Sequence, residues 1–178
     1  MYTVKSAALF QRFDVLELNL CLFCNRACHR EHVRRFFAVV SRLGDGVFWY
    51  VLILMLPVLF GRQAIAVSLH MAAVGGVGVL VYKALKARLV RERPFIQHAS
   101  IARGTAPLDQ YSFPSGHTLH AVAFSSVAVA YFPILAWLVL PFACLVAVSR
   151  VALGLHYPSD VLVGALLGAL VAATSFSL

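Results

Sequence analysis

Charged side chains are scarce in this 178-residue sequence, and acidic ones are scarcer than basic ones, with seven Asp and Glu against fifteen Lys and Arg. Only 12% of the residues are charged, 61% are hydrophobic, and the mean hydropathy is +0.85. A typical soluble domain is nearer half apolar and a quarter charged. The composition therefore argues against a soluble enzyme and predicts an integral membrane protein of one domain, too small to carry a separate soluble catalytic module.

Several other features are absent, and each excludes a class of protein. Residues 1–14 lack a clean apolar core and a small-residue cleavage site, so we expect no secretory signal peptide. Internal repeats and low-complexity segments are missing, and no basic-aromatic soluble module accompanies the net charge of +8. That charge is better explained by anionic lipid head groups or a phosphate substrate than by nucleic acid.

Cysteine usage does not define a redox compartment. Three of the four cysteines lie with two histidines in a C-x2-C-x3-C-H cluster, formed by Cys21, Cys24, Cys28, His29 and His32. Such a cluster resembles a zinc site, but it lacks a second well-spaced pair and lies in a mixed apolar and basic segment. We favour a structural role for these residues over a metal-binding or redox role.

The hydrophobic runs predict an all-α integral membrane helical bundle. Residues 10–42 alternate apolar and basic positions without about twenty uncharged residues in a row, which favours one or two amphipathic interfacial helices over a clean span. Residues 43–46 form a break. Apolar spans are expected at 47–60, 64–82, 114–133, 134–148 and 161–176. We therefore predict an amphipathic N-terminal segment, 1–46, and a transmembrane core, 47–178, with about five to six transmembrane helices in all.

The stretch from Ser149 to Asp160 places ionisable groups between two apolar runs. Such groups are costly to desolvate and are functional candidates by default. Pro158 predicts a bend, with His156 before a new helix and Asp160 in its first turn. This geometry would let a carboxylate orient one imidazole nitrogen while the other faces a substrate. A polar inter-helix turn capped by Ser159 and Asp160 would explain the same residues.

A second polar cluster follows the span at 64–82. Lys86 and Arg93 are separated by nearly two helical turns, so we expect both to project from one face of a helix that Pro94 ends. Two cations on one face suit a phosphate with two or more charges. Basic side chains reaching lipid head groups would explain the same pattern. We assign that head-group role to the neighbouring Lys83, Arg88 and Arg91.

A third cluster, Pro114-Ser115-Gly116-His117, is typical of a helix start. Ser115 would be the capping residue, and Gly116 would allow close approach of the backbone to an anion. His117 could hold a proton for a leaving oxygen, although a simple cap beside an interfacial histidine is the alternative. We interpret His120, one turn further along, as a packed side chain.

Counting membrane crossings brings the three clusters together. The charged end of the span at 64–82 and the start of the span at 114–133 are joined by a polar loop, 95–113, so they share one membrane face. The next two spans cross away and back, which places the stretch 149–160 on that same face. The loop, which contains Asp109, either covers a site or is simply exposed.

Together, the side chains of the three clusters suit phosphoryl transfer through a covalent phosphohistidine. His156 would attack phosphorus, held in the correct tautomer by Asp160. His117 would protonate the leaving alkoxide and then activate water. Three cations would hold the phosphoryl oxygens: Lys86, Arg93 and Arg150. No carboxylate cluster suits magnesium, so we expect a metal-independent reaction without a cofactor.

These residues resemble the three motifs of the type-2 phosphatidic acid phosphatase superfamily. The matching segments are Lys86-x6-Arg93-Pro94, Pro114-Ser115-Gly116-His117 and Ser149-Arg150-x5-His156-x3-Asp160. All three are complete and in order, and the resemblance covers the chain from about Asp45 onward. It implies a membrane lipid phosphatase built as a helical bundle.

By motif position, the resemblance implies that His156 is the nucleophile, Asp160 its partner and His117 the acid. It implies phosphate binding by Lys86, Arg93, Ser115, Gly116 and Arg150, with Pro94, Pro114 and Ser149 in support. Family substrates include phosphatidic acid, phosphatidylglycerol phosphate and undecaprenyl diphosphate. The compact chain looks most like small bacterial members, including undecaprenyl-diphosphate phosphatases.

The sequence departs from the six-span layout of that family, because its N-terminal third lacks a convincing first span. Most of the Lys and Arg share the face of the site, which the positive-inside rule would make cytoplasmic. The resemblance implies instead an extracytoplasmic site in a bacterial inner or plasma membrane, and we adopt that expectation. We expect a lipid phosphate and the bilayer as partners, without nucleic acid or an obligate protein partner. A lipid phosphotransferase, or a non-catalytic lipid binder or transporter, are the alternative functions.

Overall fold

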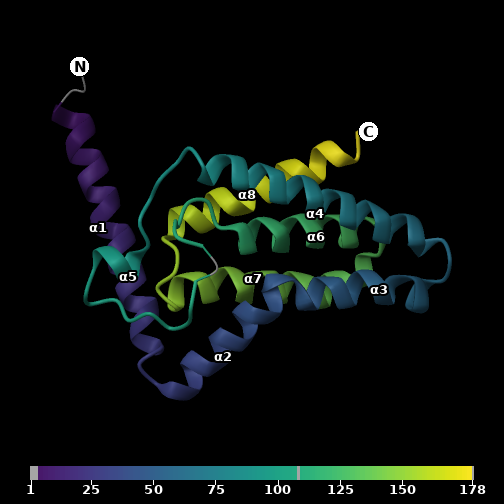
Figure 1. Cartoon of the computed structure of the whole chain (residues 1–178), viewed down its shortest axis with the longest axis horizontal. Coiled ribbons are helices and arrows are strands. Elements are labelled where there is room, and N and C mark those ends of the chain that lie inside the picture. Colours follow the sequence, from purple (N-terminus) through teal and green to yellow (C-terminus); the bar gives the residue numbers. More distant parts are fainter. Residues whose placement is uncertain (1–3, 108, 178) are drawn as a thin grey trace.

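All regular structure is helical in the computed structural model, which describes residues 4–107 and 109–177 (Figure 1). The helices are α1 (Val4–Ala27), α2 (Glu31–Arg42), α3 (Phe48–Phe60), α4 (Ala64–Lys86), α5 (Pro94–Gln97), α6 (Gly116–Tyr131), α7 (Ala136–Ala152) and α8 (Pro158–Ser175). A π-helical turn, Leu43–Val47, joins α2 to α3, and a 3-10 turn, Pro133–Leu135, precedes α7. The all-α prediction is confirmed, and the expected spans agree with the observed helices to within a few residues.

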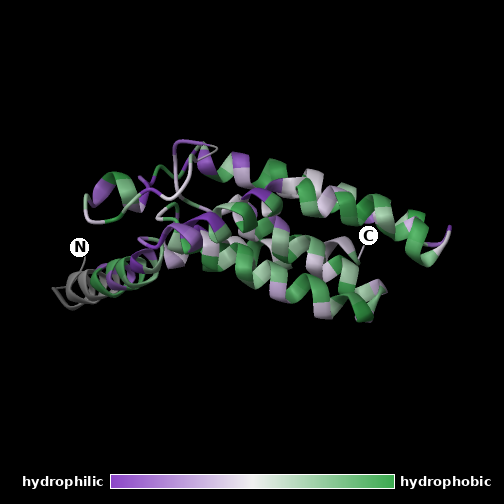
Figure 2. Cartoon of the chain, turned by 90° about the horizontal axis from the view of Figure 1, so that it is seen from below, coloured by the Kyte–Doolittle hydropathy of each residue, from purple (hydrophilic) through white to green (hydrophobic). Residues whose placement is uncertain are grey.

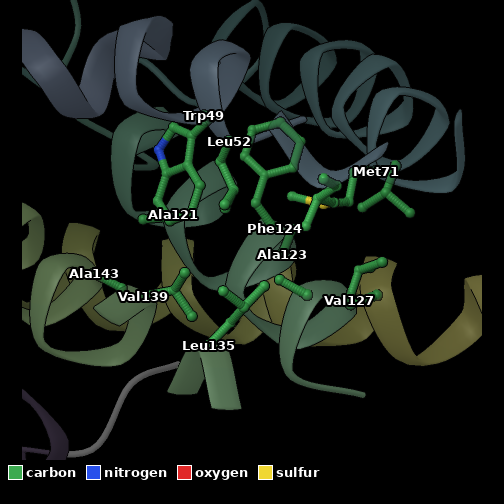
Figure 3. Close-up of a cluster of buried hydrophobic side chains, with 14 of the residues drawn as sticks. Trp49, Leu52, Met71, Ala121, Ala123, Phe124, Val127, Leu135, Val139 and Ala143 are labelled. Atoms are coloured by element: carbon green, nitrogen blue, oxygen red, sulfur yellow. The ribbon is translucent and has the colours of Figure 1, made fainter. Parts of the chain in front are cut away.

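Helix α6 lies at the centre of the bundle and contacts α4, α7 and α8 (Figure 1). The core fills the space between these helices and α3 with apolar side chains, among them Trp49, Met71, Phe124 and Val139 (Figure 3). Outside this core, large apolar side chains such as Trp137 are exposed. Polar residues gather at the end of the bundle near α1 and α5, whereas the helices of the bundle itself are mostly apolar (Figure 2). A molecule that is apolar both inside and outside belongs in a bilayer.

Four helical segments are long and apolar enough to cross a membrane: Glu31–Phe60, Ala64–Lys86, Pro133–Ala152 and Pro158–Ser175. Helix α6 runs along them but has only 16 residues, a length of about 24 Å at 1.5 Å per residue. It is short for a hydrocarbon core of about 30 Å. The membrane-protein prediction therefore holds, and the expected five to six spans correspond to four such segments plus the shorter α6.

Two glycines let α8 approach α6 closely. A Cβ atom on Gly164 would lie 2.5 Å from the carbonyl oxygen of Ser115, and one on Gly168 would collide with the carbonyl oxygen of Leu119. Small residues at such contacts allow helices to pack backbone to backbone. The backbone N–H of Ser115 donates to the carbonyl oxygen of Asp160 at 3.0 Å. The start of α6 is thus fixed against the start of α8.

The N-terminal segment forms two helices, α1 and α2. The expected break at residues 43–46 is a kink between α2 and α3, centred on Gly46, whose φ of 133° is one that side-chain-bearing residues rarely adopt. Helix α1 contacts α7 and α8. Asn25 secures it, because its amide nitrogen donates to the carbonyl oxygens of Ala102 and Ala152, each at 2.9 Å. The N-terminal segment therefore packs against the end of the bundle where α8 begins.

The cysteines are free thiols, and Cys21 and Cys28 are buried in apolar clusters at the contact of α1 with the bundle. Burial, with the nearby Glu17 carboxylate as a second cause, raises the pKa of the Cys21 thiol to about 12. Within residues 4–107 and 109–177, no group of three or more His, Cys, Asp or Glu side chains is arranged to hold a metal ion. The packing of these cysteines fits the structural role that we favoured.

Candidate active site

The three polar clusters meet around one cavity at the end of the bundle. The cavity has a volume of about 930 Å³, and Lys86, Arg93, His117, Arg150 and His156 all line it. They come from the end of α4, the residue before α5, the first turn of α6, the last turn of α7 and the loop before α8. The crossing count therefore placed the clusters on the correct common side, and the structure brings them into one site.

The expected helical face shared by Lys86 and Arg93 is wrong. Helix α4 ends at Lys86, residues 89–93 are non-helical, and Arg93 is the residue preceding α5. Pro94 occupies the first turn of α5, so it begins a helix instead of ending one. The residues between Lys86 and Arg93 form a turn and a loop instead of helix. The two cations therefore reach the same cavity from different backbone segments.

Asp109 lies between these two cations. Its carboxylate accepts from Lys86 Nζ at 2.5 Å and from an Arg93 guanidinium nitrogen at 2.6 Å. Burial alone would raise the pKa of Asp109, but the hydrogen bond and charge of Lys86, followed by Arg93, hold it below its usual value. An ionised carboxylate thus sits where the two cations could hold a phosphate. Asp109 was named only as part of the loop and was not predicted as a site residue, although it is the only acidic residue between Glu92 and Asp160.

His156 and Asp160 adopt the predicted bend. Tyr157 precedes α8, Pro158 begins it, and Asp160 lies in its first turn, where one carboxylate oxygen accepts from the backbone N–H of Tyr157 at 2.8 Å. The same oxygen, Oδ2, is 3.8 Å from His156 Nδ1. The capping role that we gave as the alternative is therefore present, since Asp160 accepts from the Tyr157 backbone. The same carboxylate also faces His156. Ser159 instead accepts a hydrogen bond from Arg91.

The second ring nitrogen of His156, Nε2, lies on the cation side, 3.3 Å from an Arg93 guanidinium nitrogen. The side chain is 1% exposed. Burial, and then the charges of Arg150, Arg93 and Lys86, hold the pKa of His156 well below its ordinary value. The imidazole is therefore neutral near pH 7, and because a guanidinium can only donate, Nε2 is the nitrogen without the proton and its lone pair accepts from Arg93.

Arg150 also lines the cavity and is buried. One of its terminal nitrogens donates to the hydroxyl of Ser41 in α2, while its Nε has no hydrogen-bond partner within the described part of the chain. A buried donor without a partner is uncommon and suits a site that receives an anion. The neighbouring Ser149 is buried as well, and its hydroxyl donates to the carbonyl oxygen of Val146 at 2.6 Å.

The start of α6 supplies the remaining candidates. Ser115 stands at the predicted capping position, yet its side chain makes no capping hydrogen bond and contacts the Thr118 hydroxyl at 3.0 Å. Pro114, which precedes it, is joined to Phe113 by a cis peptide bond. His117 Nε2 is 3.5 Å from Asp45 Oδ1, a carboxylate of the kink between α2 and α3 that was not predicted to belong to the site.

His120 packs as expected. Its ring nitrogens lie 2.8 Å from the carbonyl oxygen of Gly116 and 3.2 Å from that of Gly75, which places it between α6 and α4. It also lines the cavity, beside His117. Its contacts with two backbone carbonyls fit a side chain that joins the two helices.

The cavity continues from this polar end along an apolar wall. That wall is formed by α3, α4 and α6 and includes Trp49, Ile53, Leu54, Ala72, Val79 and Phe124. Because α3 and α4 belong to membrane-spanning segments, the apolar part lies at bilayer depth. One cavity thus offers cations for a phosphate and an apolar surface for a lipid chain.

The head-group role that we assigned to Arg91 is wrong. Its guanidinium donates to Asp160 Oδ1 at 2.8 Å, to the Ser159 hydroxyl at 2.7 Å and to Glu17 Oε2 at 2.7 Å. Its Cζ also lies 3.9 Å from the centre of the Tyr157 ring. Arg91 is therefore engaged with the turn that carries Asp160, whereas the neighbouring Arg88 is exposed.

The chain is similar to several known proteins. The model of the PAP2 superfamily matches residues 63–178. The decaprenylphosphoryl-5-phosphoribose phosphatase of Mycobacterium tuberculosis is 41% identical over 106 residues, which cover 56% of this chain and 56% of that protein. The undecaprenyl-diphosphatase BcrC of Bacillus subtilis is 34% identical over 114 residues, covering 64% of this chain and 58% of that protein. The matches thus span little more than half the length of these curated relatives.

The likeness also extends to a solved structure. The crystal structure of Aquifex aeolicus LpxE superposes on this fold with a TM-score of 0.78 and 27% sequence identity. The superposition covers 92% of this chain and 96% of the other. The similarity therefore includes the N-terminal helices, which the family model does not reach.

Proposed function

We propose, because this chain belongs to the PAP2 superfamily, that it is a membrane lipid phosphatase that removes a phosphate from a lipid through a phosphohistidine intermediate. The observation that carries this proposal is the shared cavity, which joins three cations and two histidines to an apolar wall at bilayer depth. A phosphate bound among the cations would keep its lipid chain against that wall.

Three cations would bind the phosphoryl group: Lys86, Arg93 and Arg150. The partnerless Nε of Arg150 and the backbone at the start of α6 would add donors for its oxygens. Asp109 would be displaced from Lys86 and Arg93 when the phosphate arrives, because its carboxylate and the phosphate repel each other at that distance. Loss of one contact that holds developing charge typically costs about 3 kcal/mol of barrier.

His156 would be the nucleophile. Its neutral ring attacks phosphorus through Nε2, which lines the cation side, while Nδ1 keeps its proton and faces Asp160. A nitrogen–phosphorus bond forms as the bond between phosphorus and the lipid oxygen breaks, and the electron pair stays on that oxygen. The Asp160 carboxylate would stabilise the positive charge that develops on the ring. The 3.8 Å separation would shorten as that charge appears.

His117 would handle the proton in both steps. Protonated His117 gives its proton to the leaving lipid oxygen, and the neutral ring then takes one from a water molecule. That water attacks the phosphohistidine, the nitrogen–phosphorus bond breaks, and the electron pair returns to His156. Burial and the charge of Arg150 disfavour the protonated form of His117, so Asp45, 3.5 Å from His117 Nε2, and the bound phosphate would have to stabilise that form for the first step.

The substrate would carry its phosphate on a long-chain lipid. By their names, two relatives act on a decaprenyl-linked phosphoribose and on undecaprenyl diphosphate. We therefore place undecaprenyl diphosphate first among the candidates, with phosphatidylglycerol phosphate and phosphatidic acid beside it. The three cations supply the positive charge that a metal would otherwise provide, so we propose a metal-independent reaction.

We further propose that the protein acts in a bacterial plasma membrane with the site on the extracytoplasmic face, as the resemblance implies. In this account the core, residues 47–178, holds every reacting group. The N-terminal segment, residues 1–46, would support these groups: Asp45 lines the cavity beside His117, Ser41 accepts a hydrogen bond from Arg150, and Glu17 accepts one from Arg91.

A lipid phosphotransferase is the second candidate, because the same residues would pass the phosphoryl group to another lipid instead of to water. A non-catalytic lipid binder would need the cations, but it would not need His117, His156 and Asp160 in one place. We therefore favour a catalytic function.

Phosphate release by purified, detergent-solubilised protein tests the proposal. With EDTA present, we expect release from at least one of undecaprenyl diphosphate, phosphatidylglycerol phosphate and phosphatidic acid, and slower release from a water-soluble phosphate ester that lacks contact with the apolar wall. Release that requires an added divalent metal would contradict the metal-independent mechanism. Transfer to an added lipid without release of phosphate would establish the phosphotransferase.

A further inference from the structure

We propose that Arg91, held in place by Glu17 of α1, is a positioning residue for the His156–Asp160 pair. This inference rests on the proposed function, because it assigns Arg91 a part in the same reaction. Arg91 does not line the cavity that Lys86, Arg93 and Arg150 line. It would act on the reaction through Asp160 and not through the substrate.

The two oxygens of Asp160 have different partners. Oδ2 faces His156 Nδ1 and accepts from the Tyr157 backbone, whereas Oδ1 accepts from Arg91 at 2.8 Å. The Asp160 side chain is 0% exposed. A carboxylate without water is costly to keep ionised unless a cation is paired with it. Among the described residues, Arg91 is the permanently charged partner of this carboxylate.

Arg91 is itself fixed from several sides. Its second terminal nitrogen donates to Glu17 Oε2 at 2.7 Å, and its guanidinium stacks 3.9 Å from the centre of the Tyr157 ring. Its backbone carbonyl accepts from the N–H of Ser112 at 2.8 Å. The planar guanidinium can bridge two carboxylates in one geometry, which the single ammonium of a lysine does less well. Arg91 therefore sets the position of Asp160 Oδ1, and with it the direction of Oδ2 toward His156.

Glu17 links this arrangement to the N-terminal segment. Its Oε1 accepts from the backbone N–H of Ser159 at 2.7 Å, while its Oε2 accepts from Arg91. One carboxylate of α1 thus binds both the first turn of α8 and the arginine that holds Asp160. An acidic side chain at the start of a helix is also favoured by the helix dipole. Helix α1 would therefore support the turn that carries the nucleophile.

The test compares four variants with the wild type: Arg91→Gln, Arg91→Lys, Glu17→Gln and, as the matched control, Arg88→Gln. Arg88 is an exposed arginine three residues away that takes no part in the network. For each purified protein, kcat and KM are measured on the best lipid phosphate, together with the inhibition constant of inorganic phosphate and the melting temperature.

We expect Arg91→Gln to lower kcat by roughly 30- to 100-fold, since misplacing a reacting group by about 1 Å can cost about 100-fold. KM and the inhibition constant of inorganic phosphate should change less than about threefold, because the three phosphate-binding cations remain. Arg91→Lys should restore part of kcat, Glu17→Gln should show an intermediate loss, and Arg88→Gln should match the wild type.

Two results would overturn the inference while leaving the proposed function standing. The first is an Arg91→Gln protein as active as Arg88→Gln. The second is a parallel loss of kcat, phosphate binding and melting temperature without any recovery in Arg91→Lys, which would show a general folding role. A wild type that releases no phosphate from any lipid would instead contradict the proposed function, and this inference with it.

Discussion

Removing the charge of Asp109 should make the site bind phosphate more tightly. The Asp109→Asn substitution keeps the shape of the side chain and one carbonyl oxygen, but it removes the negative charge that Lys86 and Arg93 now hold. In the proposed mechanism, a phosphate entering the wild-type site would displace that carboxylate. In the variant it would meet the same two cations without an ionic competitor.

The expected gain in phosphate affinity follows from the two contacts of Asp109, with Lys86 and Arg93, and from the solvent exposure of these side chains. A hydrogen bond to a charged group contributes about 1.5–3 kcal/mol when buried, but an exposed ion pair contributes only about 0.2–1 kcal/mol. The Asp109 side chain is 38% exposed, whereas Arg93 is 1% exposed. We therefore take about 1–2 kcal/mol for the pair of contacts, which corresponds to roughly 5- to 30-fold in affinity.

The assay is competitive inhibition of lipid-phosphate hydrolysis by inorganic phosphate. Asp109→Asn should lower the inhibition constant by that factor, while Glu92→Gln, which removes an exposed negative charge from the same connecting region, should leave it within about twofold. An unchanged or weaker affinity for phosphate in Asp109→Asn would refute the idea that Asp109 competes for the cations. It would mean that Asp109 helps to shape the anion site.

Two further predictions concern the nucleophile and the packing beneath it. Because burial and three cations hold its pKa well below the ordinary value near 6.5, His156 should keep the ¹⁵N chemical shifts of a neutral imidazole when the pH falls through that value; a midpoint near 6.5 in an NMR titration would contradict this. Gly164→Ala should lower stability by about 1–3 kcal/mol and reduce activity, since the added Cβ would lie 2.5 Å from the Ser115 carbonyl oxygen. Gly76→Ala, which meets nothing within 4 Å, should not lower stability, and equal melting temperatures of the two variants would be evidence against the close packing of α6 and α8.

Much of the fold could be predicted from hydrophobic runs and their breaks. The span expected at 47–60 is α3, and the one at 64–82 is α4 with four more residues. The length of an apolar run and the Gly or Pro residues that end it are local properties of the sequence, so they indicate the helix bounds without knowledge of the tertiary structure. The bend at Pro158 was predictable for the same reason, because proline fixes its own backbone.

The side-chain network of the site was less predictable, because its partners are brought together only by tertiary folding. Asp109 and Arg91 lie in the irregular connection between α4 and α6, and Glu17 lies on a helix whose docking the sequence did not reveal. The prediction that Lys86 and Arg93 share one helical face was wrong for a related reason. A seven-residue spacing is compatible with two helical turns or with a folded loop, and periodicity alone does not distinguish them.

The most direct test of the account is to look for the phosphohistidine itself. Purified protein would be mixed with a lipid substrate labelled at the phosphate and quenched rapidly in alkali, where phosphohistidine survives. The account predicts protein-bound label that forms and decays during turnover in the wild type. His156→Ala should show neither label nor turnover, at an unchanged melting temperature. Hydrolysis at the wild-type rate in His156→Ala would contradict the mechanism proposed for this site.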